Sequence, residues 1–292
     1  MDDRFRIIVI TVTAFICIGV VGYFGYLHAD RRMAYSRLEK EVAGIAGEFP
    51  GDVGICIKDL RTGAEIRYND EELFPSASIV KIPIMAAVFH AVDEGKVSLE
   101  DEIKLKWTHK CGGSGRLKNH RSGGRYSVKR LLELMVTESD NTATNMLTEM
   151  LGYDYLNELL EEKLGMSCTR MNRPIMDLRA RRRGVENYTS ASEIAGLLED
   201  IYHGRVIDRE QSFRMLDILL RVKSKDRIPR LLPESLPVAH KTGFMRGTCH
   251  DAGIIFTAKG DFVVCVLTSD VKSIKMAKTF IGDIAYRAYQ YY

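Results

Sequence analysis

SASIVKIPIMAAVFHAVD, residues 76–93, is the stretch of sequence that sets the centre of this fold. Apolar residues occupy most of its positions, so the pattern predicts a helix that is buried on nearly every side. The stretch also contains Ser78 and Lys81, which are three residues apart and therefore share one face of a helix. Pro83 falls in the first turns, where a missing N–H is tolerated. The predicted helix thus carries two reactive groups into the interior of the molecule.

Strand-like segments lie at both ends of the domain, and helix-like segments lie between them. The strand-like segments are residues 51–60, 64–68, 238–243, 253–257 and 262–268. Their short connections favour antiparallel pairing, so we predict an α/β (α+β) fold in which the N- and C-terminal segments form one antiparallel sheet flanked by helices. We expect the intervening residues, about 76–223, to form an inserted all-helical lobe, with a cleft between this lobe and the sheet.

The bulk composition is that of a folded domain with no metal centre. The chain has 292 residues, of which 46% are hydrophobic and 28% charged, and this excludes wholesale disorder. A net charge of +3 is too small to indicate a nucleic-acid partner. None of the six cysteines forms a CxxC pair, so we expect neither a metal site nor a cofactor. Cys111 and Cys249 lie in glycine-containing segments, where a disulfide outside the cytoplasm is one alternative and two free thiols the other.

Residues 7–27, IIVITVTAFICIGVVGYFGYL, contain no charge and are long enough to cross a bilayer. We predict a cytoplasmic tail and transmembrane anchor at residues 1–30 and a catalytic domain at residues 31–292. The alternative is a cleaved signal peptide, but the segment ends in Leu27-His28-Ala29-Asp30, a poor match to a cleavage site. The charge on the two flanks of this segment favours the opposite orientation. We give more weight to the chemistry that the motifs described next indicate, and we predict a single-pass protein of the cell membrane with an extracytoplasmic domain.

Three short motifs follow one another along the domain. They are S-x-x-K at residues 78–81, S-D-N at residues 139–141 and K-T-G at residues 241–243. Each is weak alone, and a second S-x-x-K occurs at residues 269–272. The second copy follows the last predicted strand and has no partner motif after it. The first copy opens the buried helix, S-D-N joins two predicted helices and K-T-G closes a strand, so the three together indicate one site.

The residue types in these motifs suit nucleophilic catalysis. A serine hydroxyl is a poor nucleophile until a base removes its proton, and Lys81 is within one helical turn of Ser78. An amine acts as a base only when its pKa falls. Burial among apolar residues and a second cation, Lys241, both lower the pKa of Lys81. We therefore predict that Ser78 is the nucleophile and Lys81 its base.

The quoted motifs resemble those of the serine β-lactamase and penicillin-binding protein superfamily, in particular the class A β-lactamases. The resemblance covers the chain from about residue 35 to the C-terminus and includes Gly113-Ser114-Gly115 and residues 131–135. It implies acylation of Ser78 by a lactam or peptide carbonyl, with Lys81 and Ser139 relaying protons. The remaining implied roles belong to substrate binding. Asn141 would hold the substrate amide, Lys241 and Thr242 in the Lys241-Thr242-Gly243 motif would bind its carboxylate, and the N–H groups of Ser78 and Phe244 would form an oxyanion hole.

One loop departs from the class A pattern. Class A β-lactamases carry a glutamate, followed shortly by an asparagine, between the second and third motifs, and the glutamate activates the water that removes the acyl group. Residues 173–179 here read RPIMDLR and contain no such pair. Asp177 is the nearest acid, one methylene shorter than glutamate, and Glu186-Asn187 comes later. The sequence therefore supports acylation better than release.

These residues leave three functions open. The first is a β-lactamase-like serine hydrolase that forms an acyl-enzyme at Ser78 with a small β-lactam or a related wall peptide, with Asp177 or another group supporting release. The second is a D-alanyl-D-alanine peptidase or transpeptidase of the penicillin-binding type, acting on a peptidoglycan stem peptide. The third is a penicillin-binding sensor that acylates without turnover.

The basic cluster at residues 179–183, RARRR, has two interpretations. A charge run of this kind is commonly a solvated face. Alternatively, it binds an anionic wall polymer or steers carboxylate substrates toward the cleft.

Overall fold

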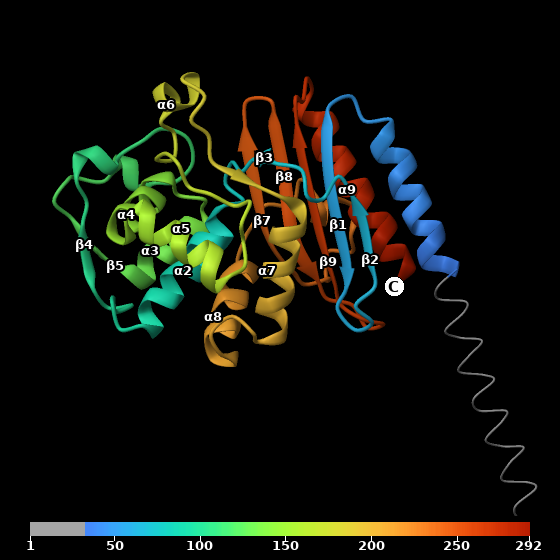
Figure 1. The fold of residues 1–292 in the computed structure, drawn as a ribbon, viewed down its shortest axis with the longest axis horizontal. Coiled ribbons are helices and arrows are strands. Elements are labelled where there is room, and N and C mark those ends of the chain that lie inside the picture. Colours follow the sequence, from blue (N-terminus) through green and yellow to red (C-terminus); the bar gives the residue numbers. More distant parts are fainter. Residues whose placement is uncertain (1–32) are drawn as a thin grey trace, which may run out of the picture. The chain divides into compact units, whose positions relative to one another are not determined.

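The computed structural model describes residues 33–292 (Figure 1). Residues 33–47 form a helix that belongs to a first compact unit, and residues 48–290 belong to the second. No helix within residues 33–292 is long and apolar enough to span a bilayer. The anchor predicted at residues 1–30 lies outside the described residues.

One antiparallel sheet of five strands forms the frame of the second unit. Its strands are β1 (Asp52–Asp59), β2 (Glu65–Tyr68), β7 (Val238–Met245), β8 (Thr248–Ile255) and β9 (Phe262–Ser269). Their order across the sheet is β2-β1-β9-β8-β7, and every neighbouring pair is antiparallel. The predicted pairing of N- and C-terminal strands is confirmed, because β1 lies beside β9 with Asp52 opposite Ser269 and Asp59 opposite Phe262.

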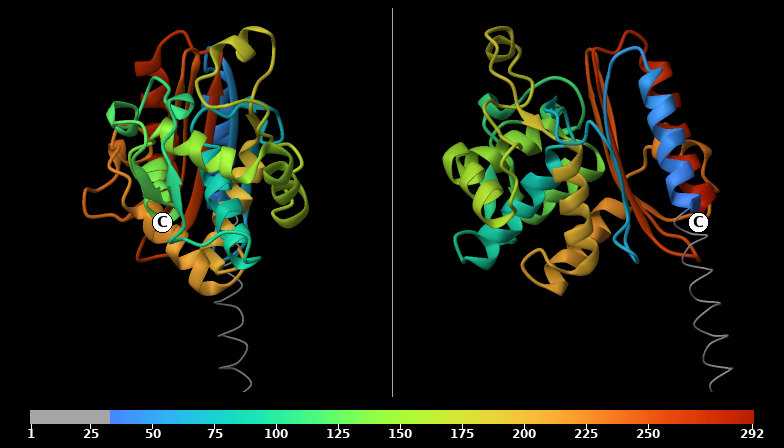
Figure 2. Two further views of the ribbon diagram at one scale, coloured as in Figure 1. Left: turned by 90° about the vertical axis from the view of Figure 1, so that its left-hand side faces the viewer. Right: turned by 45° about the vertical axis from the view of Figure 1, so that its right-hand side comes forward.

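Helices cover both faces of this sheet. On one face, α7 (Ala191–His203) packs against β1, β8 and β9, and α8 (Arg209–Leu220) packs against β7. The long C-terminal helix α9 (Ile274–Tyr291) lies on the opposite face (Figures 1 and 2). With both faces covered, the central strand β9 is buried along almost its whole length. The predicted antiparallel sheet flanked by helices is therefore confirmed.

The other helices stack beyond α7 and α8, as the left part of Figure 1 shows. They are α2 (Lys81–Asp93), α3 (Val128–Thr137), α4 (Asn141–Leu151), α5 (Tyr153–Glu158) and α6 (Leu178–Arg182). Two short pairs of strands brace them: β3 (Phe74–Pro75) with β6 (Tyr188–Thr189), and β4 (Glu102–Lys104) with β5 (Arg125–Ser127). Helix α2 contacts α3, α4, α7 and α8, and ten of its residues are buried. The expectation of an apolar helix at the centre of the molecule is met by this packing.

The start of that central helix differs from the sequence-based prediction. Regular α-helix begins at Lys81, and residues 77–80 form a tight turn that precedes it. Ala77 has a φ of +44°, a left-handed conformation that side chains rarely adopt. The turn is needed because the preceding residues, Phe74 and Pro75, are held as a strand against β6. Ser78 therefore stands on the turn that leads into α2, just outside the helix.

Candidate active site

Lys81 is the first residue of α2, and its side chain is completely buried. Its Nζ donates hydrogen bonds to the backbone O of Ser139 at 2.7 Å, to Ser139 Oγ at 3.1 Å and to Asn141 Oδ1 at 2.8 Å. Burial lowers the pKa of Lys81 well below its usual value, the positive charge of Lys241 lowers this pKa further, and Asp140 raises it. Burial and the charge of Lys241 therefore shift Lys81 toward the neutral amine, which is the form that accepts a proton.

Ser139 lies in the short connection between α3 and α4, with a φ of +53°. A left-handed non-glycine residue costs on the order of 1 kcal/mol and persists only where its surroundings hold it. Asp140 does so as the N-cap of α4, because its carboxylate accepts from the N–H groups of Ala143 and Leu117. The strained connection directs the Ser139 hydroxyl toward Lys81 instead of into the helix.

Lys241 approaches the same hydroxyl from the sheet. It lies on β7 and is 1% exposed, and its Nζ donates to Ser139 Oγ at 3.0 Å and to Thr242 O at 2.9 Å. Burial lowers the pKa of Lys241 to about 7, with Asp251 raising it and Arg227 lowering it. Near neutral pH this lysine therefore exchanges between its charged and neutral forms. Arg227, a buried cation fourteen positions before Lys241 in the chain, belongs to none of the three motifs and was not predicted from the sequence.

Ser78 is half-buried and lines a cavity of about 290 Å³. Neither its hydroxyl nor its backbone N–H makes a hydrogen bond to another residue in the range 33–292. Asn141 and Phe244 line the same cavity, with Phe244 57% exposed. The cavity is also lined by Ser76, Ala77, Gly113, Ser114, Arg173, Ile175, Met176, Leu178, Arg181, Glu186, Asn187, Met245 and Arg246. The nucleophile predicted from the sequence therefore faces an open space with its hydroxyl and N–H unengaged.

The glycine-rich loop before S-D-N packs tightly on the site. A Cβ on Gly113 would lie 2.6 Å from Asn141 Nδ2, and a Cβ on Gly115 would lie 2.2 Å from Asp140 Cγ. Asn141 Nδ2 also donates to the backbone O of Gly112 at 3.0 Å. The loop thus fixes the Asn141 amide, with its Oδ1 toward Lys81 and its Nδ2 toward the loop.

The structure does not bring Asp177 together with the other predicted residues. Its carboxylate caps α6 by accepting from the N–H groups of Arg179 and Ala180, and it does not line the cavity of Ser78. These two hydrogen bonds lower the pKa of Asp177, and the one from Ala180 has the larger effect. Ile175 lines the cavity in its place, and its backbone N–H and O both bond to the Asn145 amide, at 2.9 and 3.2 Å. The loop therefore presents the apolar side chain of Ile175 to the cavity, and not the acid that class A β-lactamases use to activate water.

Glu186 is the only carboxylic acid among the described residues that line the cavity, and its carboxylate is fully engaged. Its Oε1 accepts from Arg173 Nε at 3.0 Å, from Arg173 Nη2 and from the Asn187 N–H, and its Oε2 pairs with Arg181 at 3.0 Å. Asn187 in turn accepts from the N–H groups of Asn172 and Arg173. These contacts fasten the two ends of the loop at residues 173–187, so Glu186 and Asn187 are structural here.

The cysteines considered for a disulfide are both free thiols. Cys111 accepts from Asn145 Nδ2 at 3.4 Å, whereas Cys249 is buried on β8 beside Arg227, whose Nε lies 3.3 Å from its Sγ. Burial raises the pKa of both thiols. The disulfide alternative is therefore not the one that the structure shows.

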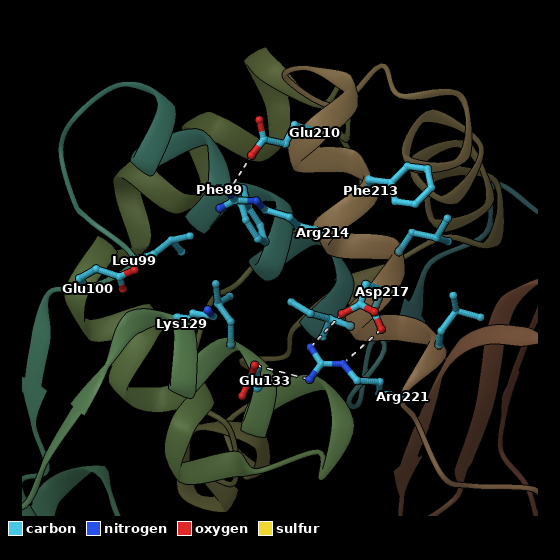
Figure 3. Close-up of a pocket in the computed structure, with 14 residues that line it drawn as sticks. Phe89, Leu99, Glu100, Lys129, Glu133, Glu210, Phe213, Arg214, Asp217 and Arg221 are labelled. Carbon is cyan, nitrogen blue, oxygen red and sulfur yellow. Dashed lines mark hydrogen bonds and ion pairs between the residues drawn. The ribbon is translucent and has the colours of Figure 1, made fainter.

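A larger hollow of about 780 Å³ lies between α2, α3 and α8 and shares no residue with the cavity of Ser78 (Figure 3). Its arginines are paired with acids: Arg214 with Glu210, and Arg221 with Glu133 and Asp217. None of the three motifs contributes to its lining, so it is not the candidate site.

A serine on a strained turn, a buried lysine with a lowered pKa and a bridging second serine define the class of serine hydrolases that work through an acyl-enzyme. A model of the β-lactamase enzyme family matches residues 37–292, and the chain belongs to this family. It is a β-lactamase-like serine hydrolase.

Three relatives illustrate the likeness. The β-lactamase from Sphaerobacter thermophilus is 33% identical, with a TM-score of 0.80 over 88% of this chain and 97% of that one. A variant of PBP-A, solved as an acyl-enzyme complex with penicillin G, is 28% identical, with a TM-score of 0.81 over 87% of this chain and 96% of that one. The β-lactamase of Streptomyces albus G is 26% identical over 80% of this chain and 77% of its own length. The resemblance to serine β-lactamases and penicillin-binding proteins is thus confirmed.

Proposed function

We propose that the protein acts on β-lactams by forming a covalent acyl-enzyme at Ser78. The observation that carries this proposal is the convergence of Lys81 and Lys241 on Ser139 Oγ, with Lys81 following three residues after Ser78 in the turn that leads into α2. Lys81, as a neutral amine, removes the Ser78 proton while Oγ bonds to the lactam carbonyl carbon. The N–H groups of Ser78 and Phe244 stabilise the oxyanion.

The proton then reaches the leaving nitrogen through Ser139. The lactam C–N bond breaks, Ser139 donates its proton to the nitrogen, and Lys81 returns the proton taken from Ser78 to Ser139. Lys241 and Thr242 hold the substrate carboxylate, and the Asn141 amide holds the acyl amide. Each proton and electron pair is accounted for within these residues, so acylation needs no metal or cofactor.

We infer that release of the acyl group is slow. Hydrolysis of the ester needs a base to activate water. Ile175 lines the cavity without a titratable group, and the Glu186 carboxylate is occupied by Arg173 and Arg181. This argument supports, as a second candidate, a penicillin-binding peptidase that acts on D-alanyl wall peptides and is trapped by β-lactams.

Intact mass of the full-length protein, followed in time after addition of penicillin G, tests these proposals. Acylation adds the mass of the whole penicillin, because the opened ring leaves no fragment. We expect this adduct on the wild type, its absence in Ser78→Ala and its persistence over many minutes. No adduct on the wild type, or an equal adduct on Ser78→Ala, would overturn the proposal. Release of D-alanine from a D-alanyl-D-alanine peptide, measured in parallel, decides on the second candidate.

We also propose that residues 7–27 anchor the protein in the cell membrane with the domain outside the cytoplasm. The support is the charge-free apolar run in the sequence and a substrate class that belongs to the cell wall. Protease added to intact cells should remove the domain. Digestion that occurs only after the cells are broken would contradict this orientation.

A further inference from the structure

The cavity beside Ser78 carries more positive charge than the acylation chemistry uses. Three arginines line it, Arg173, Arg181 and Arg246, against a single acid, Glu186. Two positive charges therefore remain uncompensated among the lining residues. Lys241 and Thr242, the residues proposed to bind the substrate carboxylate, do not line this cavity. Its occupant is consequently a different portion of the substrate.

The three arginines are not equally available. The Arg173 side chain is buried, with Nε and Nη2 bound to Glu186 and Nη1 bound to the Pro174 carbonyl. The Arg181 side chain is 31% exposed and uses its Nε for Glu186 Oε2. Arg246 is exposed and forms no ion pair within residues 33–292. Arg181 and Arg246 therefore keep accessible N–H donors for a ligand, whereas Arg173 is buried and has each of its three nitrogens engaged.

The basic cluster noted in the sequence is divided by the fold. Arg181 points to the cavity and to Glu186, whereas Arg179, Arg182 and Arg183 are exposed and do not line it. The exposed members fit the interpretation of a solvated face, whereas the steering of carboxylate substrates stays a hypothesis that only Arg181 is placed to serve. Most of the cluster is a solvated face of α6, which protrudes at the top of Figure 1, and one member belongs to the site.

Five large apolar side chains line the cavity together with polar residues such as Ser114, Asn141 and Asn187. Ile175, Met176 and Leu178 contribute from the loop, and Phe244 and Met245 contribute from the end of β7. Met176, Leu178 and Phe244 are 39%, 44% and 57% exposed, which is high for large apolar side chains. A group that fits this space has an apolar body for the wall and an anionic end for the two available guanidinium groups.

We propose that Arg181 and Arg246 select acyl donors that carry a second carboxylate on an apolar acyl side chain. This inference rests on the proposed acylation of Ser78. It adds that the ring or C-terminal carboxylate goes to Lys241 and Thr242, while the second carboxylate goes to the arginine pair. Among wall peptides, the corresponding substrate is a stem whose acyl portion bears a free carboxylate.

Three penicillins with the same benzyl group test this selection. Benzylpenicillin has hydrogen at the side-chain α-carbon, and its derivatives carry an ammonium or a carboxylate there. Second-order acylation rate constants, measured by intact mass on the full-length protein, should be about 3- to 10-fold higher for the α-carboxy than for the α-amino compound. Arg246→Glu should remove or reverse this ratio, and Arg246→Lys should largely keep it.

Arg209→Glu is the matched control. Arg209 is likewise exposed, makes no ion pair within the described residues and lies at the start of α8, away from the cavity. The substitution Arg209→Glu produces the same change in net charge as Arg246→Glu and should leave the ratio of the two rate constants unchanged. Two further variants, Arg181→Gln and Arg246→Gln, should both lower the ratio. Thermal unfolding of Arg181→Gln checks that the loop keeps its ion pair between Arg173 and Glu186.

The outcomes separate this inference from the acylation proposal. If all three penicillins acylate Ser78 and the ratio is near one, or is the same in Arg246→Glu and Arg209→Glu, then the selection by arginine is wrong while the acylation stands. If none of the three acylates the wild type, the acylation proposal fails and this inference fails with it. A ratio that falls only in the variants of Arg181 and Arg246 supports both.

Discussion

Lys81 and Lys241 direct their amino groups to one atom: Ser139 Oγ lies 3.1 Å from Lys81 Nζ and 3.0 Å from Lys241 Nζ. Both lysines are buried, and each comes from a different part of the fold, α2 and β7. Two ammonium groups so close in a buried site repel each other, so the pair favours states in which only one of the two lysines is protonated. Ser139 Oγ is in contact with both amino groups, and its hydroxyl can both accept and donate a proton.

The first prediction concerns the pH dependence of acylation. Lys81 acts as a base only when neutral, and its pKa is lowered, so acylation should increase as pH rises through that lowered pKa. Lys241 binds the substrate carboxylate only when charged, and it loses its proton as pH rises through about 7. The second-order rate constant for penicillin G should therefore be bell-shaped, with the alkaline limb near neutral pH.

Lys241→Arg provides the control, because arginine stays charged at every pH tested. Its alkaline limb should disappear even if its maximal rate is lower. A wild-type rate that continues to climb well above pH 7, or an identical alkaline limb in Lys241→Arg, would show that Lys241 does not control this step.

The second prediction is that Lys241 makes the folded state less stable at neutral pH. In the unfolded chain this lysine has its ordinary pKa of 10.5, and burial lowers the folded value to about 7. Between these values the unfolded state binds more protons, so stability rises with pH, by at most roughly 1.4 kcal/mol per pH unit from this group. Urea unfolding of wild type and Lys241→Met at several pH values between about 7 and 10 measures it. The wild type should gain stability relative to the variant across this range, and parallel curves would refute the linkage.

The third prediction is that Ile175→Glu accelerates release of the acyl group. Ile175 lines the cavity of Ser78, and the Asn145 amide holds its backbone on both sides. A carboxylate there has a raised pKa through burial and can activate water, an effect worth about 10²–10⁴-fold. The half-life of the penicillin adduct, measured by intact mass, should shorten accordingly.

Ile175→Gln is the control for shape, since it has no basic oxygen and should leave the half-life unchanged. Asp177→Asn tests the alternative that the nearest acid in the sequence supplies the base. We expect no change from it, because the Asp177 side chain caps α6. A longer half-life of the penicillin adduct in Asp177→Asn would show that Asp177 does supply the base for release.

The fourth prediction is that breaking a buried ion pair costs more stability than breaking an exposed one. Glu186→Gln leaves Arg173, whose side chain is 6% exposed, without its charged partner, and such a loss costs about 3–5 kcal/mol. Glu210→Gln breaks the exposed pair with Arg214 and should cost less than about 1 kcal/mol. Chemical unfolding of both variants measures the difference. Equal effects would mean that Glu186 does not fasten the loop.

The fifth prediction uses two glycines that share a left-handed backbone but differ in surroundings. Gly115 has a φ of +96°, and an added Cβ would lie 2.4 Å from the Asp140 Cα, whereas Gly165 has a φ of +64° and open space around it. Gly115→Ala should displace Asp140 and with it Ser139, so that acylation slows by at least about 100-fold. Gly165→Ala should cost only about 1 kcal/mol of stability and leave acylation intact. Similar acylation rates in both variants would contradict the proposed tight packing.

Much of the fold was predictable because its signals are local. Helix α4 directly follows S-D-N, which the sequence predicts to join two helices, since Asp140 caps its start and Gly152, with a φ of +76°, ends it. The sheet followed from apolar runs and short connections. The start of α2 was predicted several residues too early, because hydrophobic periodicity contains no information on the left-handed φ of Ala77. Strands β3 and β6 have two residues each and no period to detect.

The site was predictable where a residue belongs to a motif and not elsewhere. Lys81, Ser139 and Lys241 were named from three short patterns, and the structure brings them into contact. Asp177 was chosen by its position in the chain, which gives no information on where a carboxylate points. Arg246 was missed, although it lies three residues after Gly243, in the turn that directly follows β7, and that proximity was the available signal.

The pairing of β1 with β9 has a consequence for how the chain is made. Strand β1 is complete at Asp59, yet its long neighbour does not begin until Phe262, so about two hundred residues must be synthesised before the centre of the sheet can close. During that interval the hairpin of β1 and β2 has an open, apolar edge, which is prone to pair with other chains. A chain that stops before β9 has no partner for that edge. The last thirty residues therefore decide whether the first strands fold or aggregate, and chaperone dependence should be greatest just before β9 is released.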